Sequence, residues 1–324
     1  MFGSIIEFIG RHKSFLLTTH DTPDADGLGA ELVVAAILRG KGKGVRIINS
    51  SPVPRNLQFL IDENDFVEMW DPYEHSSFAE KSAMLVTDTS EEFHMGAIRQ
   101  AVKKVKEVMV IDHHDQKKIS KMTGHIDPTA SSTVELAVEL AVIMGIDLEP
   151  HIASAAYTGI VHDTGFFAYP KTTARTFQAA IKTLEWGANP NFIYKQLMES
   201  STCAAILLQR QALSNIVFYA GKKIALMLLR VEDFKAAGAE FEEVEAIVNI
   251  PLKAKEVEVS ILIRQKLTGE IFCSIRSKGV INVSRVAQRF GGGGHVTAAG
   301  FRCFDDMDKV INKLLKHVES KLKI

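Results

Sequence analysis

The stretch His20-Asp21-Thr22-Pro23-Asp24-Ala25-Asp26-Gly27 decides how the first part of this 324-residue chain is interpreted. It separates an apolar run at residues 15–17 from a small apolar segment at residues 27–30. This order is typical of a buried strand that ends in a tight turn and is followed by a helix. The turn carries the imidazole of His20 and the close carboxylate pair of Asp24 and Asp26, which repel each other unless a cation lies between them. The stretch therefore predicts a metal site, against an alternative in which the aspartates only cap the helix.

Aspartate and histidine also stand at the ends of three other apolar elements. They are Asp88 after residues 83–87, Asp112-His113-His114 after residues 107–111, and His162-Asp163 at the end of a helical pattern over residues 150–163. In an open parallel sheet, ligands bind outside the carboxyl ends of the strands. We therefore expect these clusters to face one crevice. An oxygen-rich mixture of carboxylates and imidazoles favours manganese or magnesium over ions that prefer thiolates.

A run of four glycines at residues 291–294 is followed by His295. Glycines lose the most backbone entropy on ordering, so this run is not expected to stabilise a strand or a helix. Backbone amides that converge on an anion would compensate for the loss. Upstream, Arg276 lies on an expected strand, and a guanidinium matches the oxygens of phosphate or carboxylate. The segment predicts an anion site, and a flexible loop with an incidental histidine is the alternative.

The order of these motifs resembles the DHH phosphoesterase superfamily, and the late glycine-histidine motif resembles its DHHA1 subfamily. The motifs are His-x-x-x-Asp-x-Asp at His20, the lone Asp88, Asp112-His113-His114, Asp163-Thr164-Gly165 and the glycine run before His295. Within the superfamily the chain is similar to the NrnA type, the nanoRNase and pAp-phosphatase proteins, and to relatives that cleave linear dinucleotides such as pApA. The resemblance extends from His20 to about Phe301.

The resemblance implies a centre with two divalent ions, with manganese expected and magnesium or another divalent ion as alternatives. One ion would be held by His20, Asp24 and Asp88. The other would be held by Asp26, Asp88, His113 and Asp163, with Asp88 as the bridge. Two such ions can clamp the attacking and leaving oxygens of a phosphoryl displacement and activate the attacking water.

The resemblance also implies roles in substrate binding and catalysis. His114 would face the scissile phosphate as an electrostatic stabiliser or proton donor, and Asp112 would orient a histidine ring. The residues expected to hold the substrate are His114, Arg276, Gly293, Gly294 and His295. His162 stands where a small hydroxyl residue is more usual, and its role is left open between tuning the second metal, contacting substrate and capping the helix.

The expected fold class is α/β, with a mainly parallel sheet flanked by helices, then a helical linker and a smaller α+β domain. In the first part, strands are expected at residues 14–19, 44–49, 83–87 and 107–111, and helices near residues 27–40, 131–144, 150–163 and 173–186. A helical connector is expected at 191–214. In the last part, strands are expected near residues 216–220, 223–230, 256–266, 270–276 and 296–303, with helices near residues 283–290 and from residue 305. The expected domains are a DHH domain at residues 1–190, a linker at 191–215 and a DHHA1 domain at 216–324.

The composition is consistent with a metal-dependent enzyme that takes small anionic substrates. The net charge of −1 argues against duplex nucleic acid as a partner. Residues 216–324 hold 18 Lys and Arg against 13 Asp and Glu, whereas the remainder holds 20 against 26. An acidic part that collects cations and a basic part that holds phosphates would explain this division, and an uneven surface charge would explain it equally well.

The sequence also leads to expectations about the cellular location and the oligomeric state of the protein. Three cysteines without paired spacing, no long apolar run and no signal-like start predict a cytoplasmic protein that does not contact a membrane. The family resemblance favours a homodimer.

The leading functional hypothesis is a metal-dependent phosphodiesterase that hydrolyses short nucleotides, such as pApA, pGpG, nanoRNA or pAp, to 5′-mononucleotides. The alternatives are a cyclic dinucleotide phosphodiesterase, or another DHH hydrolase such as a manganese pyrophosphatase or a RecJ-like single-strand exonuclease. A non-catalytic nucleotide-binding module is the weakest alternative, because four intact ligand motifs are not needed for simple binding.

Overall fold

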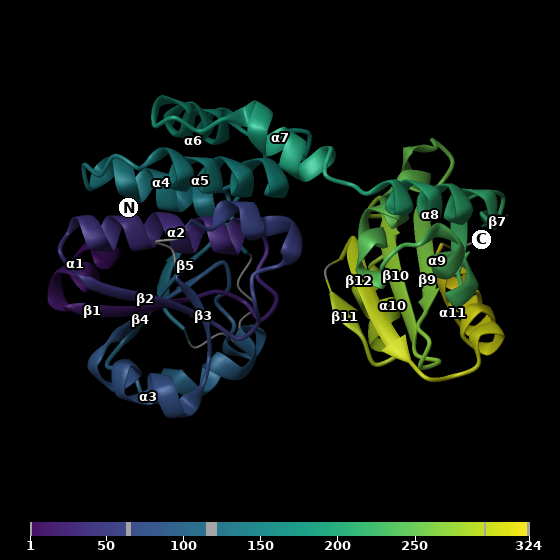
Figure 1. Cartoon of the computed structure of the whole chain (residues 1–324), viewed down its shortest axis with the longest axis horizontal. Coiled ribbons are helices and arrows are strands. Elements are labelled where there is room, and N and C mark those ends of the chain that lie inside the picture. The colour runs from purple at the N-terminus through teal and green to yellow at the C-terminus, as the bar shows by residue number, and fades with distance from the viewer. Residues whose placement is uncertain (1, 63–65, 115–121, 295, 323–324) are drawn as a thin grey trace. The chain divides into compact units, whose positions relative to one another are not determined.

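The structure is a computed structural model that describes residues 2–62, 66–114, 122–294 and 296–322. The chain divides into two compact units, Met1–Glu199 and Ser200–Ile324, and each is described by itself (Figure 1). None of the helices in the described residues is both long enough and apolar enough to cross a membrane.

The first unit is built on a parallel sheet of six strands in the order β3-β2-β1-β4-β5-β6. The strands are β1 (Ser14–Thr18), β2 (Gly44–Asn49), β3 (Val67–Met69), β4 (Ala83–Thr87), β5 (Val108–Asp112) and β6 (Gly124–Ile126). The central four correspond to the strands expected from the sequence. The sequence did not indicate the edge strands β3 and β6, because three residues are too few to show an alternating pattern.

The register of the sheet places the ends of the central strands level with one another. Thr18 of β1 pairs with Val86 of β4, and Thr87 of β4 pairs with Ile111 of β5. The residues that follow these strands therefore emerge at the same edge. The clusters at His20, Asp88 and Asp112 all leave the sheet there.

Helices cover both faces of this sheet. The helices are α1 (Gly3–Arg11), α2 (Ala25–Gly40), α3 (Pro72–Lys81), α4 (Thr133–Ile143), α5 (Pro150–Asp163), α6 (Ala174–Glu185) and α7 (Pro190–Met198), with 3-10 helices η1 (Arg55–Leu60) and η2 (Glu92–Lys103). Alternate strand residues separate two cores. Phe15 and Leu17 of β1 face the core that contains α2, α4 and α5, whereas Leu16 faces the core that contains residues of α3 and η2.

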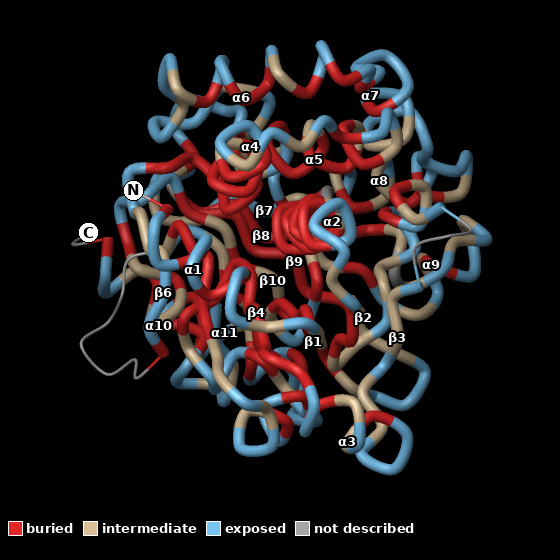
Figure 2. Tube along the Cα trace, turned by 90° about the vertical axis from the view of Figure 1, so that its left-hand side faces the viewer, coloured by how far each residue is buried: buried red, intermediate tan, exposed pale blue. Residues whose placement is uncertain are grey.

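Helix α2 is buried along most of its length, because the sheet lies on one side of it and other helices on the other (Figures 1 and 2). Its closest helical neighbour is α5, and glycines permit their approach. A Cβ added to Gly29 would lie 2.8 Å from the carbonyl oxygen of Ala155. A Cβ added to Gly159 would lie 2.6 Å from Cγ2 of Val134 and 2.8 Å from the carbonyl oxygen of Ala25. This contact fixes the N-terminus of α2 against the C-terminal half of α5.

The second unit contains a mixed sheet in the order β11-β12-β10-β9-β8-β7, in which only the β8–β9 pairing is parallel. The strands are β7 (Val217–Tyr219), β8 (Ile224–Leu229), β9 (Val259–Gln265), β10 (Ile271–Ser277), β11 (Gly293–Gly294) and β12 (Ala298–Cys303). The helices are α8 (Cys203–Ser214), α9 (Val231–Ala237), η3 (Phe241–Lys253), α10 (Val283–Gln288) and α11 (Met307–Lys321). The helical stretch expected at 191–214 is two helices, α7 and α8, which belong to different units.

The glycine run was not expected to stabilise a strand or a helix, but its last two residues lie in a strand. Gly293 and Gly294 form β11, which pairs with β12. The amides of Gly291 and Gly292 donate to the carbonyl oxygens of Gln288 and Ala287 at the end of α10, so neither is available to an anion. Close packing explains why glycine stands at residues 292 and 294, because a Cβ at either position would overlap the backbone of β12. Gly294 also has a φ of +134°, which disfavours other residues.

The contact between α2 and α5 leads to a stability prediction. We expect Gly159→Ala to lower the free energy of unfolding by about 1–3 kcal/mol, because the new methyl group has no room beside Val134 and Ala25. Denaturant unfolding measures this change. The matched control is Gly10→Ala in α1, where nothing lies within 4 Å of an added Cβ. The control should be neutral or slightly stabilising, because alanine favours a helix over glycine. Equal effects of the two variants would contradict the packing argument.

Candidate metal centre

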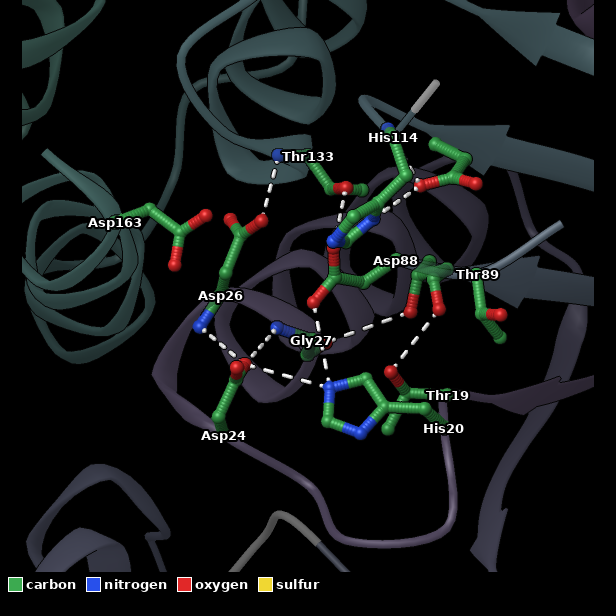
Figure 3. Close-up of polar contacts among 12 residues, drawn as sticks. Thr19, His20, Asp24, Asp26, Gly27, Asp88, Thr89, His114, Thr133 and Asp163 are labelled. Carbon is green, nitrogen blue, oxygen red and sulfur yellow. Dashed lines mark hydrogen bonds and ion pairs between the residues drawn. The ribbon is translucent and has the colours of Figure 1, made fainter. Parts of the chain in front are cut away.

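Side chains from four separate segments of the first unit meet at the carboxyl edge of the parallel sheet (Figure 3). The segments are the β1–α2 turn, the ends of β4 and β5, and the C-terminus of α5. Their carboxylate and imidazole atoms form overlapping groups of three that could hold a metal ion: His20, Asp24 and Asp88; Asp26, His113 and Asp163; Asp88, His113 and His114; and Asp24, His162 and Asp163. The ligand atoms within each group lie within 4.8 Å of one another.

The first group surrounds the ring of His20. Nε2 of His20 lies 3.6 Å from Oδ1 of Asp24 and 3.4 Å from Oδ2 of Asp88. Asp24 is also the N-cap of α2, since Oδ1 accepts hydrogen bonds from the amides of Asp26 and Gly27 at 3.0 Å. Capping and metal binding, which the sequence presented as alternatives for Asp24, are therefore compatible in one side chain.

The second group surrounds the buried ring of His113. Nε2 of His113 lies 3.2 Å from Oδ2 of Asp163, 3.6 Å from Oδ2 of Asp26 and 3.6 Å from Oδ1 of Asp88. Neither ring nitrogen of His113 has a hydrogen-bond partner among the described residues. A buried imidazole nitrogen that faces three carboxylate oxygens without a hydrogen bond fits a metal ligand.

Asp88 belongs to both groups, and its two oxygens face different histidines. Oδ2 faces His20, whereas Oδ1 faces His113. The backbone of Asp88 has a φ of +60°, in the left-handed region that few non-glycine residues adopt. Such strain is concentrated at functional sites, where the surrounding structure holds it in place. The amide of Asp88 donates to the carbonyl oxygen of Ile111 at 2.9 Å and so ties this turn to β5.

The N-terminus of α4 holds the side chain of Asp26. The amides of Thr133 and Val134 donate to the two oxygens of Asp26 at 2.7 and 2.8 Å. A helix N-terminus stabilises an anion through unpaired amides and the helix dipole. In this structure an internal carboxylate, that of Asp26, occupies the N-terminus of α4. Ser132 caps the helix by accepting from the amide of Glu135 at 3.1 Å.

The pKa values reflect the crowding of negative charge. Burial, and then repulsion by Asp88, Asp163 and Asp24, raise the pKa of Asp26 well above its usual range. Burial lowers the pKa of His20, but Asp24 and Asp88 outweigh burial and raise it to about 10. Burial also opposes ionisation of Asp163, yet His113 and His162 bring the pKa of Asp163 below its usual range. The carboxylates therefore require compensating positive charge, which divalent cations would supply.

His114 and Asp112 lie beside the cluster as a linked pair. Oδ1 of Asp112 accepts from the amide of His114 at 3.0 Å and lies 2.8 Å from Nδ1 of its ring. Burial lowers the pKa of His114, but Asp112 and Asp88 raise it to about 9. The Asp112 carboxylate thus contacts both the backbone amide and the ring of His114.

The other predicted site residues lie at the edge of the cluster, in the second unit or outside the described residues. The exposed ring of His162 lies at the edge of the cluster, with Nδ1 3.4 Å from Oδ1 of Asp163. Arg276 lies on β10 and Gly293 and Gly294 on β11, so all three belong to the second unit. His295 lies outside the described residues.

Several residues that support the cluster were not identified from the sequence. Oγ1 of Thr133 donates to Oδ1 of Asp88 at 2.9 Å. Oδ1 of Asn49 accepts from the amide of Thr19 at 3.2 Å and so holds the backbone next to His20. Nδ2 of Asn49 donates to the buried carboxyl of Glu31 at 2.9 Å. A polar residue at the end of a predicted buried strand, as Asn49 is, would have been the signal for this support.

The Thr133 contact provides a test of how the cluster is supported. We expect Thr133→Val to weaken divalent-ion binding about tenfold, because loss of a hydrogen bond to a charged partner costs about 1.5 kcal/mol or more. Isothermal titration with Mn²⁺ measures the change. Thr183→Val is the matched control, since Thr183 is also buried and its hydroxyl donates to the carbonyl oxygen of Ala180, in α6. Equal Mn²⁺ affinities in both variants would show that Thr133 does not support the site.

Comparisons with known proteins agree with these two units. The model of the DHH family, N-terminal domain, matches residues 14–160, and the model of the DHHA1 domain matches residues 221–323. The bifunctional oligoribonuclease and PAP phosphatase NrnA of Thermus thermophilus is 28% identical over 94% of this chain and 89% of its own length. The cyclic-di-AMP phosphodiesterase GdpP of Bacillus subtilis is 26% identical over 90% of this chain and 45% of its own length.

A solved structure shares the fold over nearly the whole chain. The exopolyphosphatase-related protein of Bacteroides fragilis superimposes with a TM-score of 0.90 and 26% identity, over 99% of this chain and 97% of its own. This likeness, the parallel sheet of the first unit and the mixed sheet with helices of the second unit confirm the predicted fold class, an α/β domain followed by a smaller α+β domain. The chain therefore carries a DHH-family N-terminal domain followed by a DHHA1 domain, and its similarity to NrnA and GdpP supports a phosphoric ester hydrolase.

Proposed function

We propose that this DHH-family phosphodiesterase hydrolyses short nucleotides to 5′-mononucleotides with two divalent ions, and that Mn²⁺ is the physiological metal. Its substrates would be linear dinucleotides such as pApA and pGpG, nanoRNA and pAp. The observation that carries this proposal is the carboxylate of Asp88, whose two oxygens face two different ligand groups. The similarity to NrnA supports the substrate class.

The ligand groups divide between two ions in the following way. His20, Asp24 and Asp88 would hold the first ion, and Asp26, Asp88, His113 and Asp163 would hold the second. Carboxylates outnumber imidazoles in this set, and no cysteine belongs to any of the groups, which favours Mn²⁺ or Mg²⁺ over thiolate-preferring ions. Divalent ions at these positions would neutralise charge on the phosphoryl oxygens and make water a stronger nucleophile.

His114 would act on the scissile phosphate. Asp112 engages Nδ1 of the ring, and Nε2 would be the nitrogen that contacts the substrate. A proton at Nε2 would donate to a phosphoryl oxygen or to the leaving group. Asp112 is the positioning residue of this pair, since it holds both the backbone and the ring of His114.

Residues of the second unit are the other proposed substrate contacts. Arg276 provides a guanidinium for phosphate oxygens. Gly293 is open to a ligand, since nothing lies within 4 Å of a Cβ at this position. Gly294 and His295 complete the proposed substrate residues. We further propose that the protein works in the cytoplasm as a homodimer and does not act on duplex nucleic acid.

Hydrolysis of a cyclic dinucleotide is the second candidate function. The similarity to GdpP extends over 90% of this chain, which supports it. A panel of pApA, pGpG, pAp, cyclic di-AMP and a five-residue RNA, assayed with Mn²⁺, separates the two candidates.

The metal assignment predicts about two Mn²⁺ ions per chain. We expect Asp88→Ala to lower the metal content at both groups and to reduce turnover of pApA by at least about a hundredfold, because one carboxylate serves both ions. Metal analysis and steady-state kinetics measure these effects. The control is Asp305→Ala, at an exposed aspartate of the second unit. Wild-type metal content and turnover in Asp88→Ala would refute the two-metal proposal.

The substrate assignment in the second unit can be tested without disturbing the fold. Gly293 does not have a left-handed φ and has open space, so Gly293→Ala should leave stability unchanged. If its backbone approaches the nucleotide, this variant should raise KM for pApA, and Arg276→Ala should raise it about tenfold or more. Gly294→Ala is the structural comparison, which should unfold at a lower temperature because of its φ and the nearby β12 backbone.

Two results would contradict this assignment. The first is a KM for pApA that is unchanged in both Gly293→Ala and Arg276→Ala. The second is wild-type turnover of a twenty-residue single strand as fast as that of pApA, which would favour a processive exonuclease over an enzyme for short substrates.

A further inference from the structure

The turn at residues 164–173 connects Asp163, a proposed metal ligand, to α6. Its backbone is unusual, because Gly165, Phe166 and Phe167 have successive φ values of +54°, +55° and +66°. Bulky residues rarely adopt this left-handed conformation. Hydrogen bonds hold it in place, from the amide of Phe166 to the carbonyl oxygen of Val161 at 2.7 Å and from the amide of Phe167 to Oγ1 of Thr164 at 3.1 Å. A strained conformation that is fixed in this way beside a metal ligand indicates a functional loop.

The two phenylalanines of the turn pack against other aromatic rings. The ring of Phe167 is stacked on Phe177 at a centroid distance of 4.9 Å. The ring of Phe166 meets the edge of Tyr194 at 6.0 Å. Their packing anchors the turn to α6 and α7.

Tyr169 differs from them because its ring lies against backbone. A Cβ added to Gly165 would lie 2.5 Å from ring atoms of Tyr169, so the ring covers this glycine closely. The amide of Tyr169 donates to the carbonyl oxygen of Thr164 at 2.9 Å and fixes the residue in the turn. The residue is nevertheless 57% exposed. One part of the ring is thus supported by the protein while the rest faces solvent, which makes a rigid flat surface.

Lys171 brings a positive charge from the same turn to the metal cluster. Its Nζ donates to the backbone carbonyl oxygen of His113 at 3.2 Å, and the residue is exposed. An ammonium group has three N–H donors, and this contact uses one of them. Lysine is suited to bind phosphate as a point charge.

We propose that Tyr169 and Lys171 form a nucleotide subsite at the edge of the metal cluster, in which Tyr169 stacks on the base and Lys171 binds a phosphate oxygen. The subsite rests on the proposed function for its substrate class and assigns the contacts that recognise it. Base stacking on an aromatic ring tolerates all four bases. The subsite therefore selects nucleotides over simple phosphate esters without selecting one base.

The experiment measures equilibrium binding of 5′-AMP and of ribose 5-phosphate, which lacks the base, to the full chain with saturating Mn²⁺. Tyr169→Ala should weaken binding of 5′-AMP about tenfold, as expected for loss of one base stack, and leave ribose 5-phosphate unchanged. Tyr169→Phe should bind both like the wild type, because the ring is kept. Lys171→Ala should weaken both ligands by a similar factor.

Matched controls separate this subsite from general effects of the substitutions. Tyr73→Ala removes a tyrosine that is 98% exposed at the start of α3. Lys41→Ala removes an exposed lysine whose Nζ likewise donates to a backbone carbonyl oxygen, that of Met144. Lys41 follows the C-terminus of α2, roughly 24 Å along the helix from the Asp26 end. Both controls should bind both ligands like the wild type.

The proposal is overturned if Tyr169→Ala binds 5′-AMP like the wild type, or if it loses 5′-AMP and ribose 5-phosphate equally. Unchanged binding of both ligands to Lys171→Ala overturns the phosphate contact. If Tyr169→Ala fails to fold, Tyr169→Leu keeps an apolar side chain over Gly165 without a π face, and the same two outcomes apply to it. Turnover of pApA by the wild type is measured separately. Its absence would refute the proposed function, whereas the binding pattern alone decides the subsite.

Discussion

The mutual repulsion of four carboxylates, those of Asp24, Asp26, Asp88 and Asp163, is the constraint on which the first unit depends. At the carboxyl edge of the sheet, four carboxylates so close together are stable only if positive charge or hydrogen-bond donors compensate their negative charge. The raised pKa of Asp26 and of the His20 imidazole are two consequences of the same crowding. Each element around the cluster either brings one of these carboxylates or supplies a group that stabilises it.

The helices supply much of this stabilisation. Helix α2 begins at the cluster, with Asp24 as its N-cap and Asp26 in its first turn. Helix α4 directs its first amides at Asp26. These two N-termini can converge only because α2 packs closely on α5, and Gly29 and Gly159 permit that contact. Glycines that carry no ligand atom thus permit the close packing of the backbone next to Asp26.

In the second unit, the glycine run at residues 291–294 has structural roles that the sequence did not suggest. The glycine run was interpreted as a set of free amides for an anion. In the structure, Gly291 and Gly292 donate to the end of α10, and Gly292 and Gly294 allow β12 to approach. Gly293 alone in the run combines an ordinary φ with open space, so it is the position at which a substrate role and a structural role can be distinguished.

The sequence by itself determined the α/β class, the four central strands and the residues that stand at their carboxyl ends. It could do so because apolar strands and polar strand ends are local patterns, and a parallel sheet gathers such ends at one edge. Only the tertiary structure decided that α4 holds Asp26, that Thr133 and Asn49 support the cluster, and that Lys171 reaches His113. These contacts join residues that are distant along the chain, and their donors are common residue types with no local pattern. The physical reason is that a short-range pattern encodes secondary structure, whereas the partner of a given hydrogen bond is set by how helices and strands pack.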